Sequence, residues 1–179
     1  MKVDKVKTIS DIYIGEYPFH KELYDEMVPV LEDYCDRQER STNVKATMTE
    51  WTFDSKGEYT TFKGLKKSIL DFFRINYALN TFMTNTFSPQ YDNFWANIYR
   101  RGDYTIEHDH VCSFFSCVYF LKSPKRSAPL VFSYTGKKIP SKEGTFVLFP
   151  SHLRHHVPVH RSDDTRITLS GNIRVQEET

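Results

Sequence analysis

Six of the seven histidines in the chain lie between residues 108 and 160. His108 and His110 are two residues apart in a stretch with the composition of a β-strand, and alternate residues of a strand face the same side of a sheet. Both imidazoles can therefore bind one metal ion, while Asp109 points the other way unless a β-bulge turns it. Neutral imidazole binds iron, zinc, copper and nickel alike, so the ligand type leaves the metal open. A third ligand must come from a different segment, and the candidates there are His152, His155 and His156.

Arg166 adds a second chemical function to this predicted metal site. It follows His155 by eleven residues, and a turn over residues 161–165 separates the two. On a β-hairpin Arg166 can return beside the metal, where a guanidinium group can hold a carboxylate through two parallel hydrogen bonds. Thr168 lies on the same predicted strand face and adds a hydroxyl group. The alternative for Arg166 is an ordinary solvent-exposed arginine.

Length, charge and cysteine content describe the protein that must position these residues. A chain of 179 residues is long enough for one domain with a substantial core. A net charge of +1 predicts no obligate nucleic-acid or membrane partner. No apolar run approaches the roughly 20 residues of a membrane helix, and residues 1–10 lack the apolar core of a signal peptide. The odd number of cysteines (Cys35, Cys112 and Cys117) indicates a reducing compartment, so we expect a cytoplasmic protein.

The first half of the chain predicts helices that pack on a sheet. Apolar residues recur at helical spacing over Phe19–Arg40, where Pro29 is expected to kink or split the helix. A second helix is expected over Phe62–Tyr77, and the stretch between them, Val44–Phe53, is typical of one strand. The usual layered packing then places both helices on one face of a β-sheet.

The second half predicts a β-sandwich or jelly roll. Short apolar stretches rich in β-branched and aromatic residues are separated by turn signals. An aromatic content of 15% fits a sheet-rich core. The predicted fold class is therefore mainly β with flanking helices. Seven strands are expected, at Phe94–Arg101, Ile106–His110, Phe114–Leu121, Pro129–Tyr134, Thr145–Phe149, His155–Val159 and Arg166–Val175.

Four segments of the chain resemble one protein family. Tyr99–His110 resembles the stretch that leads into the metal motif of prolyl-hydroxylase-like 2-oxoglutarate/Fe(II) oxygenases, and Ser116–Leu121 resembles the strand that follows it. Glu143–Val157 is similar to the segment that carries the distal ligand histidine, and Arg166–Thr168 to the residues that hold the cosubstrate. Over about residues 95–175, the chain thus resembles 2-oxoglutarate/Fe(II)-dependent oxygenases of bacterial and phage type.

The resemblance implies a fold and a division of the chain. The fold is a double-stranded β-helix, that is, a cupin-like jelly roll, with the N-terminal helices packed on one sheet. The chain is then a single oxygenase domain over residues 1–179. Residues 1–92 supply helical and strand support, and residues 93–175 form the metal-binding core.

The resemblance also implies residue roles. His108 is the first metal ligand and His155 the distal one, which leaves His152 and His156 as neighbours of the site. Arg166 pairs with the far carboxylate of 2-oxoglutarate, and no catalytic side chain is implied beyond the residues that hold metal and cosubstrate. The implied cosubstrate-binding residues are Tyr99, Ser116, Val118, Phe120, Arg166 and Thr168.

His110 departs from the pattern of the wider superfamily, which usually has Asp or Glu two residues after the first histidine. Two histidines and a carboxylate leave Fe(II) with a net charge of +1, whereas three neutral histidines leave +2. We expect His110 to be the third ligand because the pleat of the strand sets the spacing of two residues. The alternatives are Asp109, presented by a bulge, or a water molecule in that position.

The sequence therefore predicts a non-haem Fe(II), 2-oxoglutarate-dependent dioxygenase that uses O2, with ascorbate as an additional candidate cofactor. Its expected reaction is hydroxylation of an unactivated C–H bond, in a peptidyl proline, another residue or a small molecule. The expected partner is this small-molecule or peptide substrate, and the oligomeric state stays open. Two other functions fit the histidines, a three-histidine Zn(II) hydrolase or hydratase and a non-enzymatic cupin-like metal-binding module.

Overall fold

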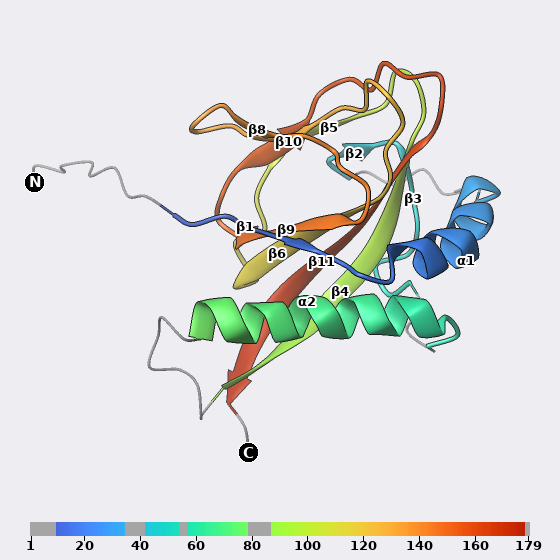
Figure 1. Ribbon diagram of the computed structural model, residues 1–179. Coiled ribbons are helices and arrows are strands. Elements are labelled where there is room, and N and C mark those ends of the chain that lie inside the picture. The colour runs from blue at the N-terminus through green and yellow to red at the C-terminus, as the bar shows by residue number, and fades with distance from the viewer. Residues whose placement is uncertain (1–9, 35–41, 54–56, 79–86, 178–179) are drawn as a thin grey trace, which may run out of the picture.

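Two antiparallel β-sheets and two helices make up the computed structural model of the chain (Figure 1). The structure describes residues 10–34, 42–53, 57–78 and 87–177. Cys35 and the end of the predicted helix Phe19–Arg40 lie outside these residues. Cys112 and Cys117 are free thiols, Cys112 exposed and Cys117 buried. Within the described residues, no helix is both long enough and apolar enough to cross a membrane.

The larger sheet has six strands and contains the longest ones. Its central strand, β11 (Arg166–Glu177), pairs along one edge with β4 (Phe87–Tyr99) and along the other with β6 (Phe115–Lys122). Beyond these, the order continues to shorter strands at both edges. The outer strands are β9 (Thr145–Pro150) and β1 (Tyr13–Glu16) next to β6, and β3 (Thr47–Met48) next to β4.

The smaller sheet has five short strands and carries three of the histidines, His108, His155 and His156. Strand β10 (His155–Val157) lies at its centre, between β5 (Tyr104–His108) and β7 (Leu130–Phe132). The two edge strands are β2 (Val44–Lys45) and β8 (Lys137–Ile139). Two facing antiparallel sheets of this kind form a jelly roll, so the predicted fold class is confirmed.

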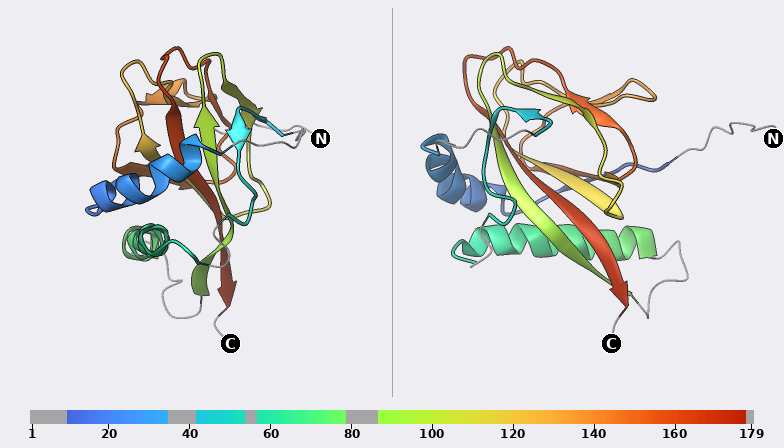
Figure 2. Two further views of the ribbon diagram at one scale, coloured as in Figure 1. Left: turned by 90° about the vertical axis from the view of Figure 1, so that its right-hand side faces the viewer. Right: turned by 180° about the vertical axis from the view of Figure 1, so that it is seen from behind.

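Both helices cover the outer face of the six-stranded sheet (Figures 1 and 2). Helix α1 (His20–Glu32) packs against β6 and β4, and α2 (Thr60–Ala78) packs against α1 and β4. Their apolar residues and those on the outward face of the sheet form one buried cluster. This cluster includes Leu23, Met27, Leu65, Ile69, Phe94, Leu169 and Ile173.

A second apolar cluster fills the space between the two sheets. Odd and even positions of a strand face opposite sides, so β6 contributes Tyr119 to the helix-covered core and Phe120 to the space between the sheets. Phe132 and Phe149 pack edge to face in this inner cluster, with ring centroids 5.0 Å apart. The inner cluster closes one part of the jelly roll and leaves the remainder for polar residues.

Several predicted element boundaries were wrong. Val44–Phe53 is not one strand, because the chain passes from the small sheet at β2 to the large sheet at β3. Helix α1 continues through Pro29 and ends at Glu32, so the proline lies in its last turn instead of splitting it. The seven predicted strands did not include β8, which pairs with β7 in a register that places Leu130 opposite Ile139.

Two isoleucines on α2 test how the helix is held to the sheet. Ile69 is fully buried, whereas Ile75 on the same helix is 60% exposed. We expect Ile69→Ala to lower the free energy of unfolding by about 2–5 kcal/mol, because a buried side chain is lost and a cavity remains. Ile75→Ala removes the same atoms from the surface and should change the free energy of unfolding by less than about 0.5 kcal/mol. Urea denaturation of both variants measures the difference, and equal losses would contradict this packing.

Candidate functional site

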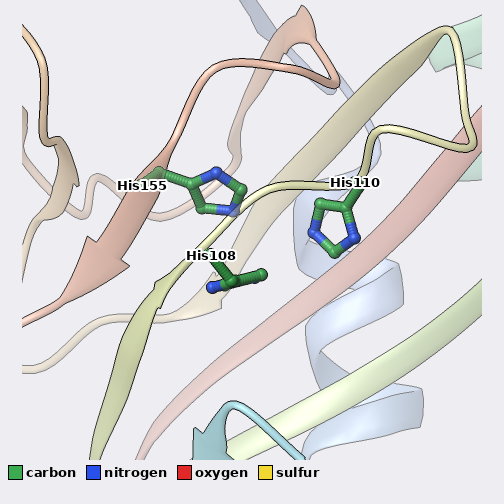
Figure 3. Close-up of side chains that lie close together, drawn as sticks. All are labelled: His108, His110 and His155. Carbon is green, nitrogen blue, oxygen red and sulfur yellow. The ribbon is translucent and has the colours of Figure 1, made fainter.

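Three histidines from two facing segments converge at one end of the small sheet (Figure 3). His108 is the last residue of β5, and it pairs across the antiparallel ladder with His155, the first residue of β10. His110 follows β5 after one intervening residue. One potential ligand nitrogen from each ring lies within 4.8 Å of the others. The chain therefore gathers three metal-binding groups that lie up to 47 residues apart in sequence.

Backbone hydrogen bonds orient two of these rings. His108 Nδ1 lies 2.8 Å from the carbonyl oxygen of Ile106, and His155 Nδ1 lies 2.9 Å from that of Leu153. A carbonyl only accepts, so Nδ1 carries the proton in both rings. Each Nε2 is then left with its lone pair, which is the form of imidazole that binds a metal.

Burial keeps the three imidazoles uncharged. It lowers the pKa of His108, it lowers that of His110 to about 4, and it lowers that of His155 to about 3. The neighbouring histidines lower the pKa values of His110 and His155 further, since a second positive charge close by is unfavourable. At neutral pH all three rings can therefore accept a metal ion without first losing a proton.

His110 joins the group from a loop, which corrects the predicted strand Ile106–His110. Strand β5 ends at His108, and the backbone N–H of His110 donates to the carbonyl oxygen of Ser151 at 2.8 Å. The pleat of β5 therefore does not set the position of His110. The Asp109 carboxylate is not part of the three-histidine group and lies 3.8 Å from the Arg154 guanidinium.

The other two candidate ligand histidines, His152 and His156, lie apart from the group. His152 is exposed in the turn before β10. His156 is half-buried, and its Nδ1 is 3.2 Å from Ser133 Oγ. Strand alternation explains the second case, because His156 faces away from its neighbour His155.

A pocket between the sheets joins the histidines to Arg166. Arg166 begins β11 and is fully buried, with its guanidinium carbon 4.6 Å from the centre of the Tyr99 ring and 5.7 Å from that of Phe120. Its Nε donates to Ser141 Oγ at 3.1 Å. Nη1 and Nη2 are buried without a hydrogen-bond partner among the described residues. No carboxylate of the described residues forms a salt bridge with this guanidinium.

The other predicted cosubstrate residues mostly line the same pocket. Thr168 shares the inner face of β11 with Arg166, and Ser116 and Val118 line the pocket from β6. Tyr99 also lines it, with its hydroxyl 2.8 Å from Thr105 Oγ1. Phe120 is buried behind the guanidinium and is not a lining residue.

Sequence reasoning missed several polar residues of the pocket. Asn97 on β4 accepts from Trp95 Nε1 at 3.1 Å and donates to Ser170 Oγ at 3.1 Å. Asn172 accepts from Ser116 Oγ at 2.8 Å and lies beside His110. A signal for two of them was available, because Ser170 and Asn172 continue the alternation that begins with Arg166 and Thr168.

The donor set fits a divalent transition metal and an anion. Three neutral imidazoles can bind divalent transition metals such as iron and zinc. A buried guanidinium with two unpaired Nη groups has the geometry that holds a carboxylate. The pocket therefore suits a metal ion together with an anionic small molecule.

Comparison with known proteins gives one sequence match and many structural matches. A family described as "Putative 2OG-Fe(II) oxygenase" matches residues 134–172, which include His155, Arg166 and Asn172. No curated protein matches the chain in sequence.

Three solved structures illustrate the fold match. The viral collagen prolyl hydroxylase of Paramecium bursaria Chlorella virus 1, in complex with 2OG, has a TM-score of 0.66 and 16% identity, with 90% of this chain and 94% of that chain covered. A Pseudomonas putida prolyl-4-hydroxylase has a TM-score of 0.65 and 17% identity, with 92% of each chain covered. The non-haem α-ketoglutarate-dependent epimerase SnoN from nogalamycin biosynthesis has a TM-score of 0.65 and 10% identity, with 95% and 81% covered.

At these identities the structural matches establish the fold. The family match adds sequence evidence over the segment that carries the distal histidine and the buried arginine. Together they confirm the resemblance to 2-oxoglutarate/Fe(II) oxygenases that the sequence motifs carry.

The depressed pKa of His155 predicts how the metal-free protein responds to acid. The folded ring has a pKa of about 3, whereas an unfolded histidine titrates near pH 6.5, at roughly its ordinary value. Between these values the unfolded chain binds one more proton than the folded chain, so stability falls as the pH falls. We expect His155→Gln to reduce the slope of the unfolding free energy against pH by about 1.4 kcal/mol per pH unit around pH 5.

Urea denaturation of the metal-free protein between pH 4.5 and 5.5 measures this slope. His152→Gln, the same substitution at an exposed histidine, is the matched control. An unchanged slope in His155→Gln would show that the ring is not held in the uncharged form.

Proposed function

We propose that this chain is a non-haem Fe(II), 2-oxoglutarate-dependent dioxygenase that hydroxylates an unactivated C–H bond. The observation that carries the proposal is Arg166, a fully buried cation whose Nη1 and Nη2 have no partner among the described residues. It lines the same pocket as His108, His110 and His155. A metal site and a carboxylate site thus share one cavity.

A buried charge requires a partner. Leaving a cation unpaired in a protein interior costs several kcal/mol, roughly, and an anionic ligand would remove that cost. The Tyr99 and Phe120 rings beside the guanidinium offset part of it through cation–π contact. We propose that the far carboxylate of 2-oxoglutarate accepts two hydrogen bonds from Nη1 and Nη2, with the Thr168 hydroxyl nearby.

The three histidines would hold Fe(II) and leave its other positions open. When bound, the metal supplies the oxidising chemistry, using 2-oxoglutarate and O2 as co-reactants. The chain itself holds the three rings in their uncharged form, orients the cosubstrate through Arg166, and shields the pocket with the inner apolar cluster. Ascorbate is a further candidate cofactor.

The charge of the site couples metal and cosubstrate. Three neutral ligands leave Fe(II) at +2, and dianionic 2-oxoglutarate would bring the pair to neutrality. Each partner should therefore strengthen binding of the other by the same factor, because linkage is reciprocal. This compensates for the carboxylate ligand that His110 replaces.

The proposed substrate is a peptide or a small molecule, with peptidyl proline as the first to test. Two of the proteins with this fold are prolyl hydroxylases, whereas a third is an epimerase. Apolar side chains exposed close to the histidines in sequence provide contact surface for such a substrate. They are Tyr104, Ile106 and Val111.

Arg166→Leu tests the cosubstrate role directly. We expect 2-oxoglutarate affinity to fall at least about 30-fold in the metal-loaded protein, because the charged partner of a buried carboxylate is lost. Anaerobic titration of Fe(II)-loaded protein with 2-oxoglutarate, followed by the weak visible charge-transfer band, measures the affinity. Succinate formation under O2 should fall with it.

The matched control is Arg174→Leu on the same strand. Arg174 is exposed and pairs with Asp92, so its loss should leave 2-oxoglutarate affinity unchanged. Tight zinc binding with no charge-transfer band would favour a Zn(II) hydrolase or hydratase instead. Metal binding without any 2-oxoglutarate turnover would favour a cupin-like binding module.

A proline-containing peptide tests the substrate class. We expect mass spectrometry to show a gain of one oxygen atom in a proline-rich peptide incubated with Fe(II), 2-oxoglutarate and O2, with succinate released in equal amount. The control is the same peptide with alanine at each proline. Succinate release without peptide oxidation would point to a different substrate and leave the oxygenase proposal intact.

A further inference from the structure

His110 is the one member of the three-histidine group whose ring is not oriented by a backbone carbonyl. In His108 and His155 a carbonyl two residues earlier accepts from Nδ1 and fixes the ring. His110 lies outside the strand, and its Nδ1 faces the side-chain amide of Asn172 on β11 at 3.5 Å. The orientation of this ring therefore depends on a side chain from another element.

Asn172 is itself held by a buried hydroxyl pair. Its amide oxygen accepts from Ser116 Oγ at 2.8 Å, and Ser116 Oγ lies 3.0 Å from Ser151 Oγ. All three residues are buried, and the backbone carbonyl of Ser151 also accepts the N–H of His110. These contacts form a closed network of hydrogen bonds that leads from His110 through Ser151, Ser116 and Asn172 back to His110.

The orientation of the Asn172 amide in this network decides which nitrogen of His110 carries the proton. When the Asn172 amide nitrogen faces His110, it donates to Nδ1. Nδ1 must then accept, and the ring proton sits on Nε2. Figure 3 shows the ring's other nitrogen on the side of His108 and His155, so this arrangement aims a proton at the metal position. With the amide reversed, its oxygen accepts from Nδ1 and leaves the Nε2 lone pair for the metal.

The hydroxyl pair permits either direction. A serine hydroxyl both donates and accepts, so Ser116 can donate to the amide oxygen or accept from the amide nitrogen. Reversal costs no buried hydrogen bond at Asn172, because each end of the amide has a partner in both states. An amide at this place is therefore compatible with both forms of His110.

We propose that Asn172 is a positioning residue for the third metal ligand, and that its amide oxygen faces His110 when the metal is held. The inference rests on the proposed function only in taking the three histidines as metal ligands. Outer hydrogen bonds of this kind fix the ring orientation and increase the donor strength of a ligating histidine.

Zn(II)-loaded protein gives a readout that is independent of oxygenase activity. Long-range proton–nitrogen correlation spectra of the histidine rings report which nitrogen carries a proton and which binds the metal. We expect wild-type His110 to carry its proton on Nδ1 and to bind zinc through Nε2. A proton on Nε2, or a His110 ring free of the metal, would overturn the proposal.

Two substitutions of similar size separate positioning from folding. Asn172→Leu removes the acceptor, and we expect zinc affinity to fall about 10- to 100-fold. Asn172→Asp supplies an oxygen that can only accept, so it should retain the Nδ1 proton and bind zinc about tenfold more tightly. Thermal unfolding of the metal-free variants shows whether each one folds.

The matched control is Asn97→Asp, which adds the same charge to the same pocket without facing His110. We expect it to leave the His110 tautomer unchanged and to increase zinc affinity less than Asn172→Asp does. Equal effects of the two aspartates would show that only charge acts, and would refute the positioning role. Failure of wild-type protein to give the Fe(II) and 2-oxoglutarate band, with these results intact, would instead refute the oxygenase assignment.

Discussion

The double pairing of β11 is the constraint on which the rest of the structure depends. This strand forms ladders with β4 on one edge and β6 on the other, so its two faces are fixed with respect to both sheets. Ile167, Leu169 and Ile173 face the helices and join the outer core. Arg166 and Thr168 face the other sheet, and a shift of register by one residue would exchange these two sets.

The inner face of β11 is polar over a length that a jelly roll would otherwise fill with apolar side chains. Two of its polar groups have side-chain partners on neighbouring strands: Ser170 accepts from Asn97, and Asn172 accepts from Ser116. The Arg166 Nη atoms have no hydrogen-bond partner among the described residues, and the three neutral histidines add no negative charge. The pocket is electrostatically incomplete without an anion, and this property gives the cosubstrate proposal its physical basis.

The small sheet sets the positions of two of the three clustered histidines. Its strands are short, and the ladder between β10 and β5 has an irregular register immediately after the pair His155 and His108. These two histidines lie opposite each other in one ladder, so the sheet itself brings them close. The third comes from a loop tied to Ser151, and this loop needs the side-chain support that β11 supplies through Asn172.

Much of the site was predictable because strand periodicity carries information about faces. The alternation placed Arg166 and Thr168 on one side, and the same rule, carried further, reaches Ser170 and Asn172. The spacing of two residues between His108 and His110 predicts a strand pleat, but the strand ends at His108 and the loop places the His110 ring.

The first half of the chain shows which structural features local sequence patterns predict and which they do not. Both helices were expected, because their apolar stripes repeat at helical spacing. The split of Val44–Phe53 between two sheets was not, because strand propensity says nothing about which partner strand each residue finds. Likewise, α1 continues through Pro29 and ends three residues later, at Glu32.

The sequence by itself determined the class of chemistry and the fold class. The patterns that predicted them are local: histidine spacing, an arginine at the start of a β-stretch, and alternating apolar residues. They can be read without knowing which residues contact one another in the fold. Only the tertiary structure decided that Arg166 is buried without an anionic partner among the described residues, that His110 is placed by a loop, and that Asn172 reaches its ring. These are contacts between residues far apart in the chain, and they depend on strand pairing and register, which local periodicity does not encode.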